Sequence, residues 1–151
     1  MNAIELLKSD HKVVEGLFKQ VESTEEGKHP AIFAEIKKEL DVHAHIEETI
    51  FYPKLKEEGK KELVDIVLEG IEEHRQVKMF LKELDALSDD SEKFEPKLKV
   101  LMEDVEHHVK EEEEEMFPKV KSEFDSAVLD ELGAKMAAEK QAFKKTASAS
   151  A

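Results

Sequence analysis

Apolar residues recur along this chain in alternating steps of three and four, the spacing that places side chains on one face of an α-helix. The first stripe of this kind consists of Ile4, Leu7, His11, Val14, Phe18 and Val21, and three later segments repeat the pattern. Pro30, Gly59 and the cluster Ser88-Asp89-Asp90-Ser91 lie between the segments as breakers. The pattern therefore predicts four long helices, over residues 2–22, 30–57, 61–87 and 93–121.

The short connections between these helices favour antiparallel neighbours. We therefore expect an all-α protein, an up-down-up-down four-helix bundle over residues 1–121, with a kink or restart at Pro53. A shorter amphipathic segment predicts an extra C-terminal helix within residues 122–145, which caps one end of the bundle or packs sideways. The last residues, 146–151, are low in complexity, and we expect a disordered tail there.

Composition narrows the classes of function. Glycine and proline number only 5 and 4 in 151 residues, and 40% of the residues are charged, which suits helices and argues against sheets. The net charge of −14 disfavours nucleic acid and anionic membranes as partners. The absence of cysteine excludes disulfides, thiolate metal sites and iron–sulfur clusters. We see no signal peptide and no membrane span, so we expect a soluble, cytoplasmic protein.

Four histidines fall on the apolar stripe, one in each predicted helix, where a packed core would normally contain leucine: His11, His43, His74 and His108. Glu47 and Glu112 lie on the same stripes, four residues after a histidine. Burying an imidazole or carboxylate without a partner costs on the order of a few kcal/mol. A bound cation shared by all six groups would offset this cost of burial.

An internal repeat supports this interpretation. Asp10-His11 resembles Glu73-His74, and the segment from His43 to Pro53 resembles the segment from His108 to Pro118, with the same spacing from histidine to glutamate to proline. Each half of the chain therefore supplies one single histidine and one His-x-x-x-Glu pair. Two such halves predict a pseudo-two-fold site for two metal ions.

Four residues advance a helix by about one turn, so a His-x-x-x-Glu pair can hold one ion with both side chains. With Glu47 and Glu112 as bridges, each ion would receive two nitrogens and two carboxylate oxygens. This ligand set suits two iron ions joined by an oxo or hydroxo bridge best. A mixed iron–manganese pair is the next choice, and zinc is the third. Positions would remain for an exogenous ligand.

The motifs resemble those of the hemerythrin-like proteins of the HHE cation-binding family over roughly residues 1–121. The resemblance rests on Asp10-His11, on His43-x-x-x-Glu47-Glu48 with Phe51-Tyr52-Pro53, on Glu73-His74, and on His108-x-x-x-Glu112 with Phe117-Pro118. It implies a four-helix bundle with a non-haem di-iron centre.

The chain departs from oxygen-carrying hemerythrins at two places. Those proteins use a His-x-x-x-His pair on the third helix, whereas Lys78 follows His74 by four residues here, which leaves one ion with fewer nitrogen ligands. They also space the last histidine and carboxylate by five residues, which His107 and Glu112 would satisfy. The stripe and the repeat favour His108, and His107 remains the alternative.

Other polar residues near the motifs have more ordinary interpretations. We expect Tyr52 to pack beside Pro53, although the kink could turn it inward to join the metal ligands. Asp10 and Glu73 are expected on the helix surface or as hydrogen-bond partners of the ligands. Lys78 is expected at the edge of the stripe with its ammonium group in solvent.

Two further histidines and an acidic run lie off the predicted cluster. His29 is expected in an exposed loop, and His45 points away from the stripe as a surface group or a partner of a ligand. The run Glu111–Glu115, apart from Glu112, is expected to be a solvated helix face.

The ligand set predicts a di-iron protein that binds or reacts with dioxygen or a related small oxidant, such as peroxide or nitric oxide. Reversible binding, as in a carrier or sensor, and turnover, as in a peroxide-decomposing enzyme, both remain open. The alternative function is iron buffering or storage without oxidant turnover, and a structural zinc bundle is a third. The sequence identifies neither a protein partner nor an electron donor.

Overall fold

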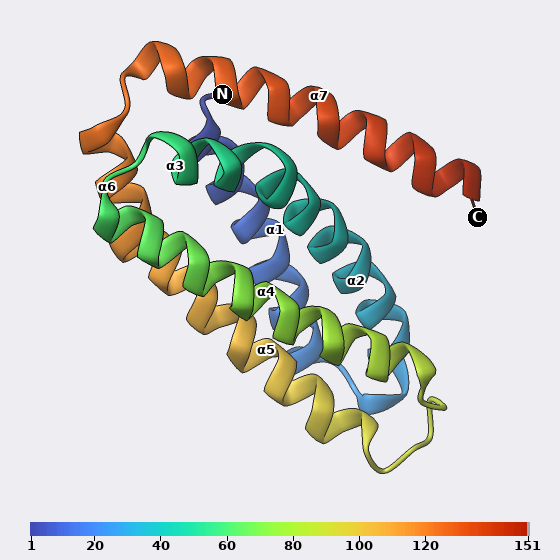
Figure 1. Cartoon of the computed structure of the whole chain (residues 1–151). Coiled ribbons are helices and arrows are strands. Elements are labelled where there is room, and N and C mark those ends of the chain that lie inside the picture. The colour runs from blue at the N-terminus through green and yellow to red at the C-terminus, as the bar shows by residue number, and fades with distance from the viewer. Residues whose placement is uncertain (151) are drawn as a thin grey trace.

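The computed structural model describes residues 1–150, and side chains up to Thr146, as five helical rods (Figure 1). The first rod is α1 (Ala3–Ser23), and a short 3₁₀ turn (Glu26–Lys28) leads into the second. The second joins α2 (His29–Ile46) through a π-helical turn (Glu47–Phe51) to α3 (Tyr52–Glu58), and the third is α4 (Lys61–Ala86). The fourth joins α5 (Phe94–Glu111) through a second π turn (Glu112–Met116) to α6 (Phe117–Glu123), and the fifth is α7 (Ser126–Ser150).

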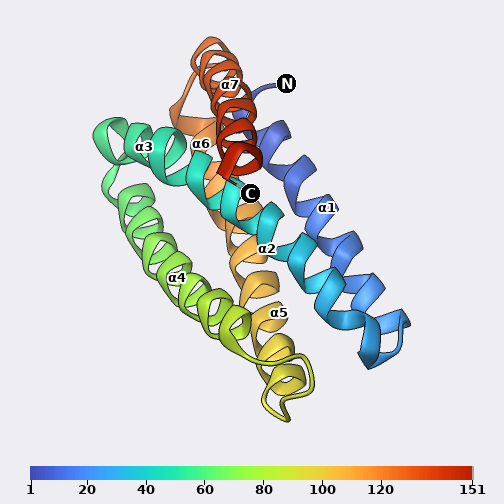
Figure 2. The same cartoon turned by 90° about the vertical axis from the view of Figure 1, so that its right-hand side faces the viewer.

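The predicted all-α bundle with an added C-terminal helix is confirmed. The first four rods run antiparallel to their neighbours in the chain (Figures 1 and 2). Local sequence explains where they begin. Asn2 caps α1, its side chain accepting a hydrogen bond from the Glu5 amide while the Glu5 carboxylate accepts one from the Asn2 amide. Pro30 lies in the first turn of α2, where its missing N–H is not needed.

The two π turns occupy equivalent places in the two halves, each ending two residues before a proline, Pro53 or Pro118. A proline ring clashes with the carbonyl four residues earlier in a regular α-helix, and a wider turn relieves that clash. The kink or restart expected at Pro53 therefore takes the form of a π turn. Each π turn begins at the glutamate of a His-x-x-x-Glu pair.

Two apolar cores fill the bundle, and the predicted polar cluster lies between them. One core includes Leu7, Ile46, Val67 and Met116, and the other includes Val14, Leu40, Leu81 and Val105. On each helix the histidine lies between a residue of the first core and a residue of the second. The His and Glu side chains therefore form a buried polar layer across the middle of the molecule, enclosed by apolar side chains on both sides.

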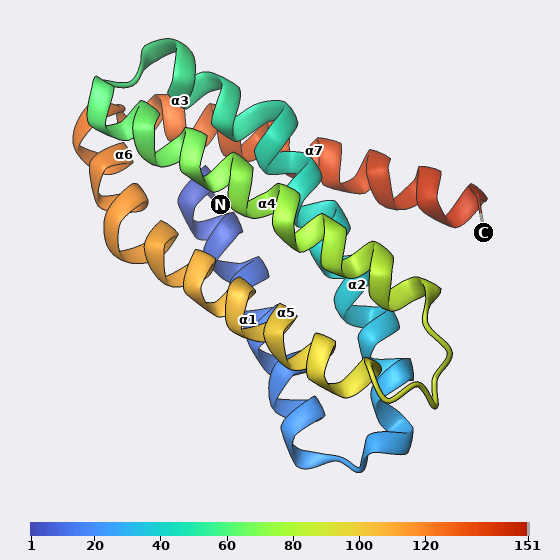
Figure 3. The ribbon, with the colours of Figure 1, turned by 60° about the horizontal axis from the view of Figure 1, so that its bottom comes forward.

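Helix α7 lies along the outside of the bundle, across α1 and α2 (Figure 3). Gly133 allows the close approach, because a Cβ there would overlap the backbone of Met1 and Asn2. Sideways packing was one of the two predicted placements. The helix is longer than predicted. It continues to Ser150 and so includes most of the segment 146–151, where we expected a disordered tail. Alanine-rich sequence without glycine or proline explains the extension, and Ala151 lies outside the described residues.

Across the described residues, no helix combines the length and apolar character needed to cross a bilayer. The cytoplasmic location expected from the sequence stays a prediction.

Candidate metal centre

The six predicted ligand residues converge in the polar layer. His11 comes from α1, His43 from α2, His74 from α4 and His108 from α5, and all four are buried. Glu47 and Glu112 begin the two π turns and are 0% and 1% exposed. The structure therefore brings together every residue that the sequence placed in this cluster, from four separate rods.

The imidazoles turn their Nε2 atoms toward the two glutamates. In one half, His11 Nε2 lies 3.1 Å from Glu112 Oε1, and His43 Nε2 lies 3.3 Å from Glu47 Oε1. In the other half, His74 Nε2 lies 3.0 Å from Glu47 Oε1, and His108 Nε2 lies 3.3 Å from Glu112 Oε2. Each carboxylate thus contacts one histidine from each half, the arrangement expected of a bridge.

The six residues divide into two groups of potential ligands. Ligand atoms of His74, His108, Glu47 and Glu112 lie within 4.8 Å of one another, and so do those of His11, His43 and Glu112. Glu112 belongs to both groups. The geometry therefore accommodates two adjacent ions, one in each half.

The Nδ1 atom of every ring donates to an outer carboxylate. His43 donates to Asp10 (2.9 Å), and His108 donates to Glu73 (2.7 Å). His74 donates to Glu48 (2.8 Å), and His11 donates to Glu113 (2.6 Å). We refer to Asp10, Glu48, Glu73 and Glu113 as the outer acids. They fix each ring with Nε2 directed inward, as is usual for histidines that bind metals.

Three buried atoms of the cluster have no hydrogen-bond partner among the described residues: His43 Nε2 and both carboxylate oxygens of Glu47. An unpaired buried carboxylate is costly. Imidazole nitrogens and carboxylate oxygens directed at one point suit iron, manganese or zinc. The residues present therefore fit a metal centre, and a cation would satisfy the atoms that the protein leaves unpaired.

Electrostatics in the layer favour positive charge. Burial alone lowers the pKa of His43, but Glu47 and Asp10 outweigh burial and raise this pKa to about 10. Burial opposes ionisation of Glu112, but His108 and its other partners hold the pKa of this carboxyl well below its usual range. At Glu48, the hydrogen bond from His74 and the charge of Lys78 lower the pKa to about 2. The Glu112 and Glu48 carboxylates are therefore ionised and attract cations.

Comparison with known proteins identifies the fold family. Residues 2–120 match the Hemerythrin family, described as the hemerythrin HHE cation binding domain. The chain belongs to this family. The resemblance inferred from the sequence is therefore confirmed, and the buried cluster lies at the centre of the matched region.

Several relatives resemble this HHE domain over most of its length. An uncharacterised protein of Mycobacterium tuberculosis strain H37Rv is 34% identical over 142 residues, covering 91% of this chain and 84% of the relative. A protein of Nostoc sp. described as a DNA nickase is 28% identical over 131 residues, covering 83% of this chain. The chain spans only 35% of that nickase's length. A crystal structure of an HHE cation binding domain-containing protein from Mycobacterium kansasii superposes with a TM-score of 0.83 at 31% identity, covering 97% of this chain and 90% of that one.

Tyr52 lies inside the cluster of this HHE domain. Regular α-helical spacing would have placed it on a different face from His43 and Glu47. Its hydroxyl donates to Glu112 Oε2 and lies 3.3 Å from His74 Nε2 and 3.4 Å from His108 Nε2. The π turn contains one extra residue, which rotates the following residues back by about 100° and brings Tyr52 onto the Glu47 face. Tyr52 packs in the apolar core as expected, but its hydroxyl turns inward, and ligation of a metal by Tyr52 stays a prediction.

The outer acids were only partly predicted. Asp10 and Glu73 hold ligand rings as expected, but Glu113 was assigned to a solvated face, and Glu48 had no role. The repeat contained the missing signal, since Glu48 and Glu113 follow the two bridging glutamates at the same position. Helix α7 adds Lys140, whose ammonium group donates to Asp10, a contact across 130 residues that no local pattern encodes.

The remaining histidines lie outside the cluster. His108 rather than His107 faces inward, and His107 is 65% exposed on its side chain. His45 points away as predicted, pairing with Glu139 of α7 at 2.8 Å. His29, expected in an exposed loop, is instead 6% exposed at the start of α2, where Glu95 accepts a hydrogen bond from its Nδ1.

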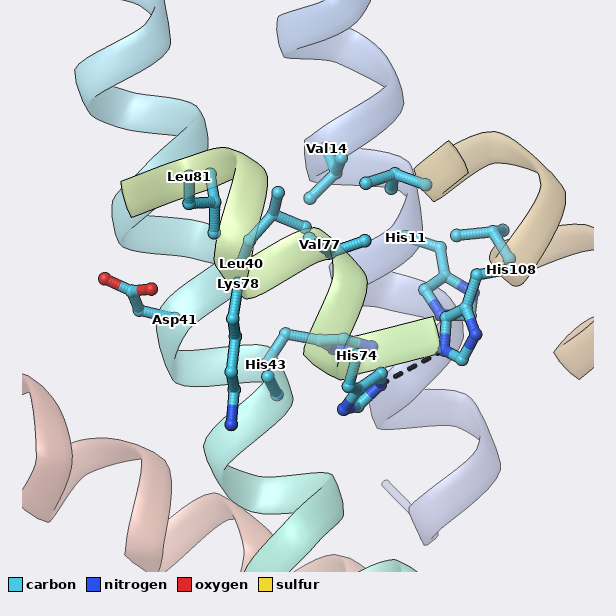
Figure 4. Close-up of a pocket in the computed structure, with 13 residues that line it drawn as sticks. His11, Val14, Leu40, Asp41, His43, His74, Val77, Lys78, Leu81 and His108 are labelled. Atoms are coloured by element: carbon cyan, nitrogen blue, oxygen red, sulfur yellow. Dashed lines mark hydrogen bonds between the residues drawn. The ribbon is translucent and has the colours of Figure 1, made fainter. Parts of the chain in front are cut away.

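A small apolar cavity adjoins the cluster (Figure 4). Its volume is about 40 Å³, and the four imidazoles lie beside an apolar wall formed by Val14, Leu40, Val77, Leu81 and Val105. The charged residues that line it are Asp41 and Lys78. One water molecule needs only about 10–15 Å³ of such space, so the cavity accommodates small molecules.

Proposed function

We propose that this HHE domain is a non-haem di-iron protein that binds or reacts with dioxygen or a related small oxidant, such as peroxide or nitric oxide. The observation that carries the proposal is the Glu47 carboxylate, whose two buried oxygens lack hydrogen-bond partners while facing inward-directed imidazoles. A carboxylate in this position is stabilised by a cation, and the nitrogen and oxygen set around it suits iron.

His11 and His43 would hold one ion, and His74 and His108 the other, with Glu47 and Glu112 shared between them. Tyr52 is a further candidate ligand in the second half, because its hydroxyl lies 3.3 Å and 3.4 Å from the two Nε2 atoms of that half. Bound iron would supply exchangeable coordination positions and the electrons that a small oxidant takes up.

The chain itself controls orientation, protons and water. The outer acids keep a proton on each Nδ1 and direct each Nε2 inward, where an ion would bind. Tyr52 holds a proton at its oxygen, directed at Glu112. The apolar wall of the cavity favours a small, weakly polar guest over water, which supports dioxygen and similar molecules as ligands.

Lys78 occupies the position where oxygen carriers have a histidine ligand. Its ammonium group donates to Glu48 at 2.5 Å, and its side chain is 53% exposed, so it reaches away from the cluster. The second half therefore has fewer nitrogen ligands than an oxygen carrier, and this favours reaction with the oxidant over simple reversible carriage.

DNA is not part of the proposal, although the Nostoc relative is described as a nickase. The net charge of −14 repels a phosphate backbone. We likewise propose neither a membrane nor a protein partner.

The test begins with protein purified without added metal, analysed for metal content and visible absorption. We expect two irons per chain and the absorption of a ferric pair. Glu47→Gln, which preserves shape, and His74→Leu should both lose iron, whereas His45→Leu, outside the cluster, should retain it. Helical circular dichroism separates loss of metal from loss of fold. Full iron content in Glu47→Gln would contradict the proposal.

Stopped-flow mixing of the reduced protein with oxygen or peroxide then separates the candidate activities. A persistent adduct indicates binding, and repeated consumption of peroxide indicates an enzyme. Iron that a mild chelator removes easily, with no reaction toward either oxidant, would instead support iron buffering.

A further inference from the structure

A second group of potential ligands lies on the outside of the bundle. His107 and Glu111 are one turn apart on α5, and Glu73 reaches them from α4. His107 Nε2 lies 3.0 Å from Glu111 Oε1 and 3.9 Å from Glu73 Oε2. Ligand atoms of the three residues lie within 4.8 Å of one another. Solvent reaches all three side chains, so an ion could enter without opening the bundle.

Two of the other three outer acids, Asp10 and Glu48, bind a lysine, whereas no lysine or arginine forms an ion pair with Glu113 among the described residues. Asp10 binds His43 with one oxygen and the ammonium group of Lys140 with the other. Glu48 binds His74 with one oxygen and the ammonium group of Lys78 with the other. In both cases a cation rests on the oxygen turned away from the ligand ring.

Glu73, like Glu113, lacks such a lysine, but it differs from Glu113 in having a second imidazole beside it. Its Oε1 accepts from His108 Nδ1, but its Oε2 faces His107, and among the described residues no lysine or arginine forms an ion pair with it. Asp10 is the equivalent residue of the other half, and the cation there comes from α7. Helix α7 covers α1 and α2, on the Asp10 side. Beside Asp10, the outward-facing oxygen meets the ammonium group of Lys140. Beside Glu73, the equivalent position is lined by the His107 imidazole and the Glu111 carboxylate.

We propose that Glu73, His107 and Glu111 form a surface site for a divalent transition-metal cation such as Zn²⁺ or Fe²⁺. One nitrogen and two carboxylate oxygens suit these ions, and water would complete the coordination. Nearby Glu69 and Asp104 add negative charge around the group. Glu73 connects this outer site to the buried cluster, since its two oxygens face His107 and His108.

The outer site does not depend on the proposed di-iron function, because none of its three residues belongs to the buried cluster. It also gives His107 a role. The sequence offered that residue as an alternative inner ligand, and the structure turns its ring outward instead.

Equilibrium dialysis of the metal-stripped full chain against Zn²⁺ tests the site by counting bound ions at saturation. We expect His107→Ala and Glu111→Gln each to bind one zinc fewer per chain than the unmodified protein. His45→Ala is the matched control, because His45 pairs with a surface carboxylate but belongs to no group of three potential ligands among the described residues. Its zinc count should not change.

Mn²⁺ locates the ion independently, since it broadens the NMR signals of nearby rings. The His107 ring should broaden in protein whose buried cluster is already filled with zinc, and the His45 ring should not. Equal zinc counts in His107→Ala and the unmodified protein, or equal broadening of both rings, would mean an adventitious surface cation only and overturn the proposal. The His74→Leu variant tests the two sites separately. If it loses the buried ions but keeps the zinc that depends on His107, the outer site binds metal whether or not the di-iron proposal is right.

Discussion

Tyr52 and Phe117 occupy equivalent positions after the two π turns, and they make the two halves of the polar layer different. Phe117 stacks on His11, with 6.0 Å between ring centroids and 5° between planes. Tyr52 lies against His74 at 5.3 Å and adds a hydroxyl that donates to Glu112. The hydroxyl oxygen of Tyr52 is thus one difference between the surroundings of the two predicted ions.

Removing that oxygen should destabilise the metal-free protein. We expect Tyr52→Phe to lower the free energy of unfolding by about 1–3 kcal/mol, because the buried Glu112 carboxylate loses a donor. In a Glu112→Gln background the same substitution should cost less, since the acceptor is no longer charged. Urea unfolding of the four proteins in this double-mutant cycle measures the coupling. An equal cost in both backgrounds would show that Tyr52 acts only through packing.

His29 shows that a polar residue beside a loop can be buried and structural. Its Nδ1 donates to Glu95 at 2.7 Å, and its Nε2 donates to the Thr24 carbonyl at 3.1 Å. Two N–H donors are present only in the protonated ring. Burial lowers the pKa of His29, but Glu95 and the carbonyl outweigh it and raise the pKa above its usual value.

This shift predicts a pH-dependent contribution to stability. Because the pKa is higher in the folded state, the contribution is complete below the unfolded value of about 6.5 and disappears as pH rises through the folded pKa. His29→Asn should therefore cost more stability, by about 1 kcal/mol, near pH 5.5 than near pH 8.5. Urea unfolding at both pH values tests this. Glu95→Gln should show the same trend, and a cost independent of pH in both variants would refute it.

At the scale of elements, α7 is connected to the polar layer as well as to the surface of the bundle. Lys140 binds Asp10, which holds the ring of His43, while Glu139 and Phe143 enclose His45 from the same helix. Lys140 is therefore a positioning residue, since it acts on His43 through Asp10. Within the described part of the chain, no helix covers the other half in this way.

Lys140→Met should weaken the hold on one ion while leaving the other unchanged. Metal loss from the His11 and His43 half is expected to become up to about 10-fold faster, the lower end of the effect of removing a direct partner of a ligand, because Lys140 acts through Asp10. Chelator-induced release, followed by absorption, should then change from one phase to two. Lys135→Met, on an exposed part of α7, is the control. A uniform change in both phases would indicate general destabilisation of the fold.

At the scale of the molecule, most of the architecture could be predicted because the apolar stripes and breakers are local. The stripe phase and the repeat also predicted that six residues would lie in one layer. Tyr52 was misplaced because counting by 3.6 residues per turn fails across a π turn. Lys140 and His29 could not be placed because their partners are distant in sequence, and a stripe on one helix contains no information about the helix that covers it.

The polar layer between the two apolar cores also determines how the helices can be aligned. Sliding any one rod by a turn, about 5.4 Å, would carry a charged carboxylate or an imidazole into a region of leucine, valine and phenylalanine, with no partner to receive it. A uniform leucine interior would tolerate such a slip. The six inward-facing groups thus fix the register of four long helices to within a single turn. The same side chains would bind the ions.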